Sequence, residues 1–221
     1  MRFYTDFRYK DRETKAKYVW LKYGPLLEGK KILDVGADQC HLRQHLDAGA
    51  SYFGVGLGEG VDQQVDLDKE RLPFPDNSFD CVLCLDVLEH LENIHRTFDE
   101  LCRVSSRHVI ISLPNPYLGE FYFRLRHGDY SPGQTTKFYG LPLEPPPDRH
   151  RWFFSYEEAE RFVLYRSGLN RMRVLQLDPE WTTGRARFLE RLAEMILFRR
   201  DLDARNLRSG PLWAALEKLP E

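Results

Sequence analysis

The sequence predicts an α/β fold: a doubly wound, mostly parallel, seven-stranded Rossmann-like sheet with an irregular, aromatic-rich cap insertion. Short apolar runs alternate with segments of helical spacing, an order typical of a parallel sheet covered on both faces. The first apolar run ends in a tight turn at Gly36, and several later runs end in polar residues. These observations predict a ligand crevice beyond the carboxyl ends of the strands.

Composition is that of an ordinary globular protein. The 221 residues fit one domain, with 42% apolar and 30% charged residues and a net charge of -2. This charge gives no footprint for general nucleic-acid binding. The chain has neither an apolar leader nor an apolar run long enough to span a bilayer. We therefore predict a cytoplasmic protein with no nucleic-acid partner and no membrane span.

The N-terminal segment, residues 1–29, is charged and aromatic. Helical spacing predicts a helix over residues 12–23, and Gly24-Pro25 is expected to end it. The ordinary interpretation is a helix packed on the sheet. The alternative, which we carry forward as an N-terminal helical lid, is that its aromatic residues close over the ligand.

The cofactor-binding core is predicted over residues 30–115. Its first strand covers residues 32–35 and is followed by the Gly36 turn and a helix through Leu42 and Leu46. The next three strands are expected at residues 51–57, 65–67 and 79–85.

Asp86 and Glu89 have the spacing of a capping box, which predicts a helix starting at Asp86 and running through Leu101. A fifth strand is expected at residues 108–114. Cys81 and Cys84 lie three apart in the fourth strand and should point to opposite faces. We therefore expect core thiols rather than a metal site or a disulfide.

The rest of the chain is expected to cover and complete the sheet. Residues 116–150 are rich in proline, glycine and aromatic residues without periodicity, and we predict a substrate cap there. Within residues 151–221, Ser155 and Glu158 form a second capping-box pattern for a helix that Gly168 ends. Strands are expected at residues 172–177 and 212–216, the latter with a terminal helix as the alternative. Between them, residues 185–200 predict an amphipathic helix that packs on the core, with membrane binding as the alternative.

Seven residues fall where the predicted strands end, at one edge of the sheet, and most of them are polar or turn residues. These residues are Asp34, Gly36, Gly56, Asp66, Leu85, Asp86 and Asn115.

Residues 31–116, and more loosely the chain to its C-terminus, resemble the class I S-adenosylmethionine-dependent methyltransferases, most closely the type 11 group of small-molecule methylases. The resemblance is carried by Ile-Leu-Asp-Val-Gly at 32–36, Leu-Pro-Phe-Pro-Asp-Asn-Ser-Phe-Asp at 72–80, Asp-Val-Leu-Glu-His-Leu at 86–91 and Glu-Leu-Cys-Arg-Val at 100–104. It implies S-adenosylmethionine as the cofactor and a small-molecule substrate.

The resemblance also implies which residues bind the cofactor. Asp34 and the Gly36 turn would approach the methionine part, Asp66 and Leu67 the adenine, and Leu85 and Asp86 the reactive sulfonium. The full implied set is Asp34, Gly36, Ala37, Asp38, Gly56, Leu57, Asp66, Leu67, Leu85 and Asp86.

Two features depart from the family pattern. The usual loop after the first strand has glycines where this chain has Asp38 and Cys40. Aspartate tolerates positive φ well, so Asp38 can keep the turn, whereas Cys40 needs extra room. Second, Gly56 stands where an acidic residue usually pairs with the ribose hydroxyls. Glu59 and Asp62 are the candidates to replace that acid.

An oxygen acceptor needs a base, and the candidates are His90, His150, Asp148 and Tyr139. We assign His90 and His150 as catalytic. A capping-turn role for His90 and a salt-bridged surface role for His150 are the alternatives.

We assign Asn115, Tyr139, Arg149 and His150 to substrate binding. No metal-ligating motif is recognised, because His41 and His45 have no companion ligands.

The predicted function is methyl transfer to an oxygen or nitrogen nucleophile of a small molecule. The alternative is a catalytically silent binding protein of the same fold. A nicotinamide-dependent oxidoreductase would share the crevice but not the segment from Asp86 to His90.

Overall fold

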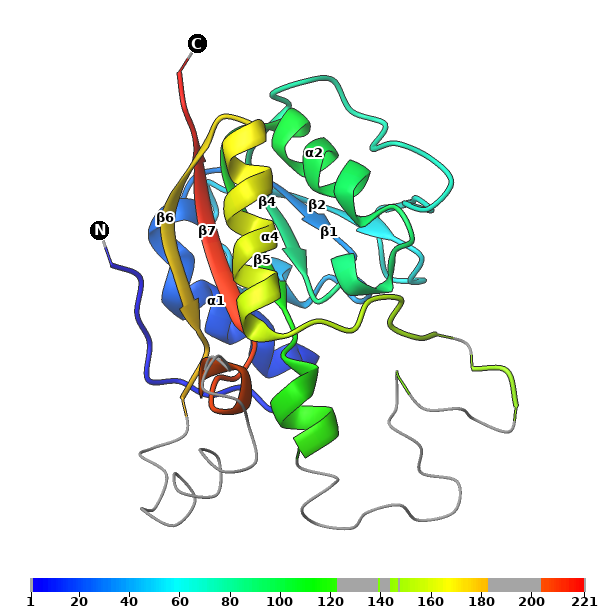
Figure 1. Ribbon diagram of the computed structural model, residues 1–221. Coiled ribbons are helices and arrows are strands. Elements are labelled where there is room, and N and C mark those ends of the chain that lie inside the picture. Colours follow the sequence, from blue (N-terminus) through cyan, green and yellow to red (C-terminus); the bar gives the residue numbers. More distant parts are fainter. Residues whose placement is uncertain (1, 123–138, 140–143, 147, 183–203, 221) are drawn as a thin grey trace.

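Seven strands form a single sheet in the order β3-β2-β1-β4-β5-β7-β6 among the residues that this computed structural model describes, namely 2–122, 139, 144–146, 148–182 and 204–220 (Figure 1). The strands are β1 (Lys31–Val35), β2 (Ser51–Gly56), β3 (Gln63–Gln64), β4 (Phe79–Leu85), β5 (Ser105–Leu113), β6 (Met172–Pro179) and β7 (Leu212–Lys218). β1 to β5 pair in parallel, and β7 runs antiparallel to both of its neighbours. The predicted fold class is confirmed.

Helices cover both faces of the sheet. α1 (Arg12–Leu27) packs on one face, and α2 (Ile94–Val104) and α4 (Tyr156–Leu169) pack on the other (Figure 1). Residues 81–84 of β4 are buried, which explains the apolar run that follows Asp80. Cys81 belongs to the α1-side core and Cys84 to the opposite core, and all four cysteines are free and buried. The prediction of core thiols is confirmed.

The predicted end of α1 was wrong. The helix continues through Gly24-Pro25 to Leu27, although Pro25 lacks the N–H that a helix interior normally uses. Leu26 is 6% exposed and Leu27 is fully buried. Burial of these two leucines offsets the lost hydrogen bond and holds the last turn in place.

The helix expected after β1 is also different. Only a five-residue 3₁₀ helix, η1 (His41–His45), forms there. Asp38 and Cys40 have left-handed backbones, with φ of 50° and 54°, so regular helix starts only after Cys40. Leu42 and Leu46 had indicated an α-helix, and of the two only Leu42 is buried.

The capping box expected at Asp86 does not form. Asp86 has φ of 55°, and its carboxylate binds side chains of α1 and β5 instead of a helix N-terminus. One turn of 3₁₀ helix, η2 (Leu88–His90), follows, and α2 begins only at Ile94. By contrast, the capping box of Ser155 and Glu158 at α4 is confirmed in both directions.

The third strand is shorter and earlier than predicted. β3 is Gln63–Gln64, whereas Val65 and Leu67 follow it as buried loop residues. Their alternating apolar pattern therefore indicated burial but not strand pairing. β7 is a strand, as predicted.

Other expectations fall partly or wholly outside the described residues. The predicted helix at 185–200 lies among residues that the structure does not describe. Of the predicted cap, the structure describes a π-helix, η3 (Tyr117–Tyr122), and isolated residues up to His150. A further 3₁₀ helix, η4 (Ala204–Leu207), precedes β7. Among the described helices, none has the length and apolar character needed to cross a membrane.

Candidate active site

A cavity of about 470 Å³ lies at the carboxyl ends of β1, β4 and β5. One face of α1 forms one wall, and the segment Ser209–Pro211 before β7 contributes another. This is the edge at which parallel α/β sheets bind ligands, and the volume lies within the range of small-molecule sites.

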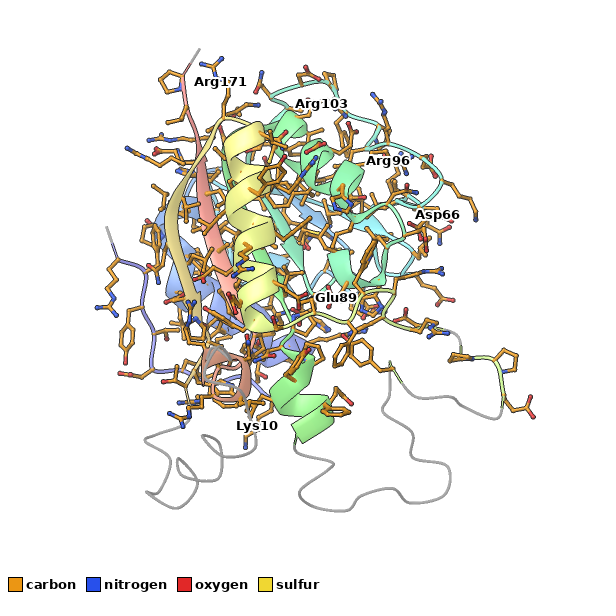
Figure 2. All side chains as sticks on the ribbon, in the orientation of Figure 1. Lys10, Asp66, Glu89, Arg96, Arg103 and Arg171 are labelled. Atoms are coloured by element: carbon orange, nitrogen blue, oxygen red, sulfur yellow. The ribbon has the colours of Figure 1, made fainter. Side chains whose placement is uncertain are left out.

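The structure brings most of the predicted site residues together around this cavity. Those that line it are Asp34, Gly36, Ala37, Asp38, Leu85, Asp86, His90, Asn115, Tyr139 and His150. Those that do not are Gly56, Leu57, Asp66, Leu67 and the exposed Arg149. Asp66 lies at the periphery of the molecule, well away from Glu89 in the cavity wall (Figure 2).

Asp34, near the end of β1, is a buried carboxyl group facing the cavity. It is 8% exposed and accepts a 2.6 Å hydrogen bond from the Tyr52 hydroxyl. Burial raises the pKa of Asp34 to about 6, although Tyr52 and the charge of Lys15 act in the opposite direction. Asp34 is thus ionised at neutral pH and could hold a cation.

Lys15 of α1 joins the helix to the ends of two strands. Its Nζ lies 2.6 Å from Asp86 Oδ2 and 3.1 Å from Ser112 Oγ, and Ser112 donates a 2.6 Å hydrogen bond to Asp86 Oδ1. Burial alone raises the pKa of Asp86, but Lys15 and Ser112 outweigh it and leave that pKa below its ordinary value. Asp86 is therefore a neutralised part of the cavity floor.

Lys15 was not recognised in the sequence, although a signal was present. Arg12, Lys15, Ala16 and Val19 all line the cavity and are spaced as one face of a helix.

The altered glycine loop keeps its turn. Asp38 takes a left-handed conformation and pairs with Arg12 of α1. Cys40 has room because Gly54 of β2 lacks a side chain: a Cβ at Gly54 would lie 2.5 Å from Cys40 Sγ. Gly54 thus supplies the space that the sequence indicated Cys40 would need.

The candidate replacements for the ribose acid are engaged elsewhere or lie outside the cavity. Asp62 accepts a 2.7 Å hydrogen bond from the Gly54 N–H and pairs with Arg43. Glu59 is exposed, and neither residue lines the cavity. Val87 packs closely on the Gly36 turn, because a Cβ at Gly36 would lie 2.2 Å from Val87 Cγ2.

Asp66 pairs with Lys69 at the surface, with 2.7 Å between the carboxylate and the ammonium. The hydrogen bond from Lys69 lowers the pKa of Asp66.

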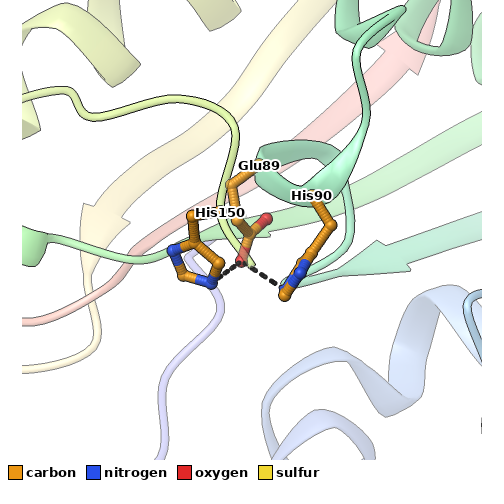
Figure 3. Close-up of side chains that lie close together, drawn as sticks. All are labelled: Glu89, His90 and His150. Carbon is orange, nitrogen blue, oxygen red and sulfur yellow. Dashed lines mark ion pairs between the residues drawn. The ribbon is translucent and has the colours of Figure 1, made fainter. Parts of the chain in front are cut away.

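Glu89, His90 and His150 form a cluster in the cavity wall (Figure 3). Glu89 is completely buried, and neither of its carboxylate oxygens has a hydrogen-bond partner among the described residues. Burial raises the pKa of Glu89 well above its ordinary value. The Nε2 atoms of His90 and His150 each lie 3.9 Å from Glu89 Oε1. Sequence patterns predict a catalytic role for each histidine but do not associate either one with Glu89, whose predicted role is in a helix cap.

Comparison with known proteins finds one family model that matches part of the chain. The sequence model of a family described as "Methyltransferase domain" matches residues 33–112. No curated protein matches the sequence significantly.

Solved structures with the same fold include a SAM-dependent methyltransferase from Archaeoglobus fulgidus, with 15% identity and a TM-score of 0.57 over 94% of this chain and 95% of that one. The [4+2]-cyclase SpnF has 13% identity and a TM-score of 0.55 over 100% of this chain and 86% of its own. Magnesium protoporphyrin IX methyltransferase from Synechocystis PCC 6803, crystallised with bound SAH, has 16% identity and a TM-score of 0.54 over 94% of this chain and 83% of that one. At these identities the structures show a common fold.

The raised pKa of Asp34 predicts a pH dependence of stability. Between about pH 4 and about pH 6 the folded protein keeps a proton on Asp34 that the unfolded chain has released, so this group lowers the free energy of unfolding as the pH rises. In Asp34→Asn this contribution disappears. The free-energy difference between variant and wild type should therefore shift in favour of the variant by about 2 kcal/mol between pH 4 and pH 7.

Urea denaturation at a series of pH values measures this shift. Glu92→Gln, which removes an exposed carboxylate outside the cavity, is the control. Parallel pH profiles for wild type and Asp34→Asn would contradict the assignment.

Lys15→Met should destabilise the fold, because it removes two hydrogen bonds and leaves the Asp86 charge without its ammonium. We expect a loss of about 1–3 kcal/mol in the free energy of unfolding. Lys17→Met changes an exposed lysine of the same helix and should cost under about 0.5 kcal/mol. The free energies of unfolding are measured by urea denaturation at neutral pH. Equal losses in the two variants would show that the hydrogen bonds of Lys15 do not stabilise the fold.

Proposed function

We propose that the chain is a class I S-adenosylmethionine-dependent methyltransferase of the type 11 group, and that it methylates an oxygen or nitrogen nucleophile of a small molecule. The match of residues 33–112 to a methyltransferase family model and the shared fold support this proposal. One observation carries the proposal. A single cavity contains both the Asp34 carboxyl and Gly36 turn of the cofactor side and the His90 and His150 side chains of the acceptor side.

The residues present fit the amino-acid half of the cofactor. Asp34 is buried, ionised at neutral pH and positioned to pair with the ammonium group. The ionised carboxylates of Asp34 and Asp86 both face the cavity, and the ammonium of Lys15 neutralises only one of them. Because S-adenosylmethionine carries both an ammonium and a sulfonium, this excess of negative charge favours it.

We assign the adenine end to the side of Asp66 and Leu67, at the end of β3 and beyond the cavity itself. Support for this assignment comes from the resemblance of these positions to the family's adenine-binding pair. Asp66 is partly exposed and already pairs with Lys69, so its contribution to affinity should be smaller than that of Asp34.

When bound, S-adenosylmethionine supplies an electrophilic methyl group: the acceptor's lone pair forms a bond to the methyl carbon as the carbon–sulfur bond breaks and its electrons pass to sulfur. The chain's part is to orient the reactants, exclude water and accept a proton. Asn115, Tyr139 and His150 border the acceptor half of the cavity. His90 is oriented by Asp148, whose carboxylate lies 2.8 Å from His90 Nδ1, and this arrangement suits His90 to activate an acceptor hydroxyl.

Asn115 has a structural role as well. Its side-chain amide donates hydrogen bonds of 2.9 and 2.7 Å to the carbonyl oxygens of Asn206 and Ser209. These bonds fix the segment before β7 as a wall of the acceptor half.

A second candidate function is ligand binding or catalysis without methyl transfer. Gly56 lacks the ribose acid, and Val87 covers the Gly36 turn. The [4+2]-cyclase SpnF has the same fold. Protein that binds the cofactor but transfers no labelled methyl group to any of a panel of phenols, alcohols and amines would favour this candidate.

The cofactor assignment predicts a graded effect of two substitutions. Calorimetry should detect binding of S-adenosylhomocysteine to the wild type. Asp34→Ala should weaken it by at least about tenfold, the loss of one charge-assisted hydrogen bond. Asp66→Ala should weaken it by about threefold, because Asp66 is partly exposed and already paired with Lys69.

Glu92→Gln serves again as the control and should leave the affinity unchanged. The assignment fails if the wild type binds neither S-adenosylhomocysteine nor S-adenosylmethionine, or if Asp34→Ala binds as tightly as wild type while remaining folded.

A further inference from the structure

Two segments far apart in the chain are fixed against each other at the Glu89, His90 and His150 cluster. The backbone N–H of Arg151 donates a 2.8 Å hydrogen bond to the carbonyl of Glu89, and the indole of Trp152 donates one of 2.7 Å to the carbonyl of Leu91. These two hydrogen bonds hold the backbones that carry the three side chains in fixed positions relative to each other.

Glu89 is the unusual member of this cluster. Its side chain is completely buried, yet both of its oxygens lack a hydrogen-bond partner among the described residues. The distance of 3.9 Å from Oε1 to each histidine Nε2 is longer than a hydrogen bond. A buried carboxylate without a hydrogen bond is costly, so this geometry points to a group that the carboxylate is built to hold.

Hydrogen bonds behind the two histidines determine which nitrogen faces Glu89. Asp148 Oδ1 lies 2.8 Å from His90 Nδ1 and, as a carboxylate, accepts a proton from it. The Tyr139 hydroxyl donates to the carbonyl of Trp152 at 3.2 Å, so its oxygen accepts from His150 Nδ1 at 2.8 Å. Both rings thus carry hydrogen on Nδ1 and direct the Nε2 lone pair toward Glu89 (Figure 3).

We propose that Glu89, His90 and His150 bind one divalent transition-metal ion. Their ligand atoms lie within 4.8 Å of one another, and a carboxylate with two imidazoles is a donor set that suits zinc, cobalt or iron in the divalent state. Metal bonds of 2.0–2.1 Å place tetrahedral ligands about 3.4 Å apart, so small side-chain rotations bring the observed 3.9 Å spacing into range. Asp148 and Tyr139 are positioning residues that orient the two imidazoles.

The site has room for a further ligand. Three protein ligands leave coordination positions open, as in catalytic zinc sites, and all three residues line the cavity. Resting on the methyl-transfer function proposed above, this inference identifies the acceptor as an oxygen nucleophile that binds the ion. Coordination lowers the pKa of a hydroxyl and takes over the activation otherwise assigned to His90.

Cobalt binding tests the site without any need for activity. Tag-free protein is treated with a chelator, dialysed and titrated with Co²⁺ while its visible absorption is followed, and Zn²⁺ is then added as a competitor. We expect one Co²⁺ per chain, displaced by Zn²⁺. Glu89→Gln and His150→Ala should each weaken Co²⁺ binding by more than about tenfold, and Asp148→Asn by about tenfold.

His41→Ala is the matched control, because His41 lines the same cavity outside the cluster. It should bind Co²⁺ as the wild type does. Circular dichroism checks that each variant folds, and His150→Gln replaces His150→Ala if the latter does not. Metal-free wild type that takes up no Co²⁺, or folded Glu89→Gln and His150→Ala proteins with wild-type affinity, would overturn the metal site.

Binding of S-adenosylhomocysteine to the same samples separates this inference from the proposed function. If the cofactor product binds but Co²⁺ does not, only the metal site is wrong. If Co²⁺ binds but the cofactor product does not, the metal site stands and the methyl-transfer proposal fails.

Discussion

The ion pair between Lys15 and Asp86 is the interaction on which the cavity depends. It joins α1 to the end of β4 and, through Ser112, to β5. Without it, a charged carboxylate at the strand ends would face a helix that offers no other hydrogen-bond donor to it among the described contacts. Because the Lys15 side chain is only 12% exposed, this pair is far less screened than a surface salt bridge. This ion pair therefore holds α1, which forms one wall of the cavity, against the carboxyl ends of β4 and β5.

Three carboxyl groups at the cavity differ in how many protein partners they have. Asp86 is satisfied by Lys15 and Ser112, and Asp34 receives one hydrogen bond from Tyr52. Glu89 receives none from the described residues. The number of protein donors and cations bound to each carboxyl group thus falls from Asp86 through Asp34 to Glu89. We assign a cationic ligand to each of the last two: the cofactor's ammonium to Asp34 and a metal ion to Glu89. The small number of protein partners of these two carboxyl groups supports both assignments.

Strand positions could be predicted because a strand buried on both faces has a continuous run of apolar residues. β4 matched its predicted bounds, and β7 was found as a strand. The helices after β1 and β4 could not be predicted, since leucine spacing and a capping-box pattern do not reveal left-handed residues at Cys40 and Asp86. Local patterns also say nothing of contacts between distant segments. His150 was recognised as polar and near the cap, but only the fold brings it to Glu89.

The failed capping box explains how the cluster arises. In a regular helix starting at Asp86, the Glu89 side chain would bind the backbone at the helix N-terminus. Asp86 instead adopts a left-handed conformation, one turn of 3₁₀ helix follows, and Glu89 enters the cavity wall. Among the described residues, three of the five non-glycine residues with positive φ (Asp38, Cys40 and Asp86) lie in the loops after β1 and β4. Strain of this kind persists where the surrounding structure enforces it, and it collects at functional sites. Strained residues and a buried carboxylate occur together at this cavity. A ligand-binding role explains this combination, whereas folding stability alone does not.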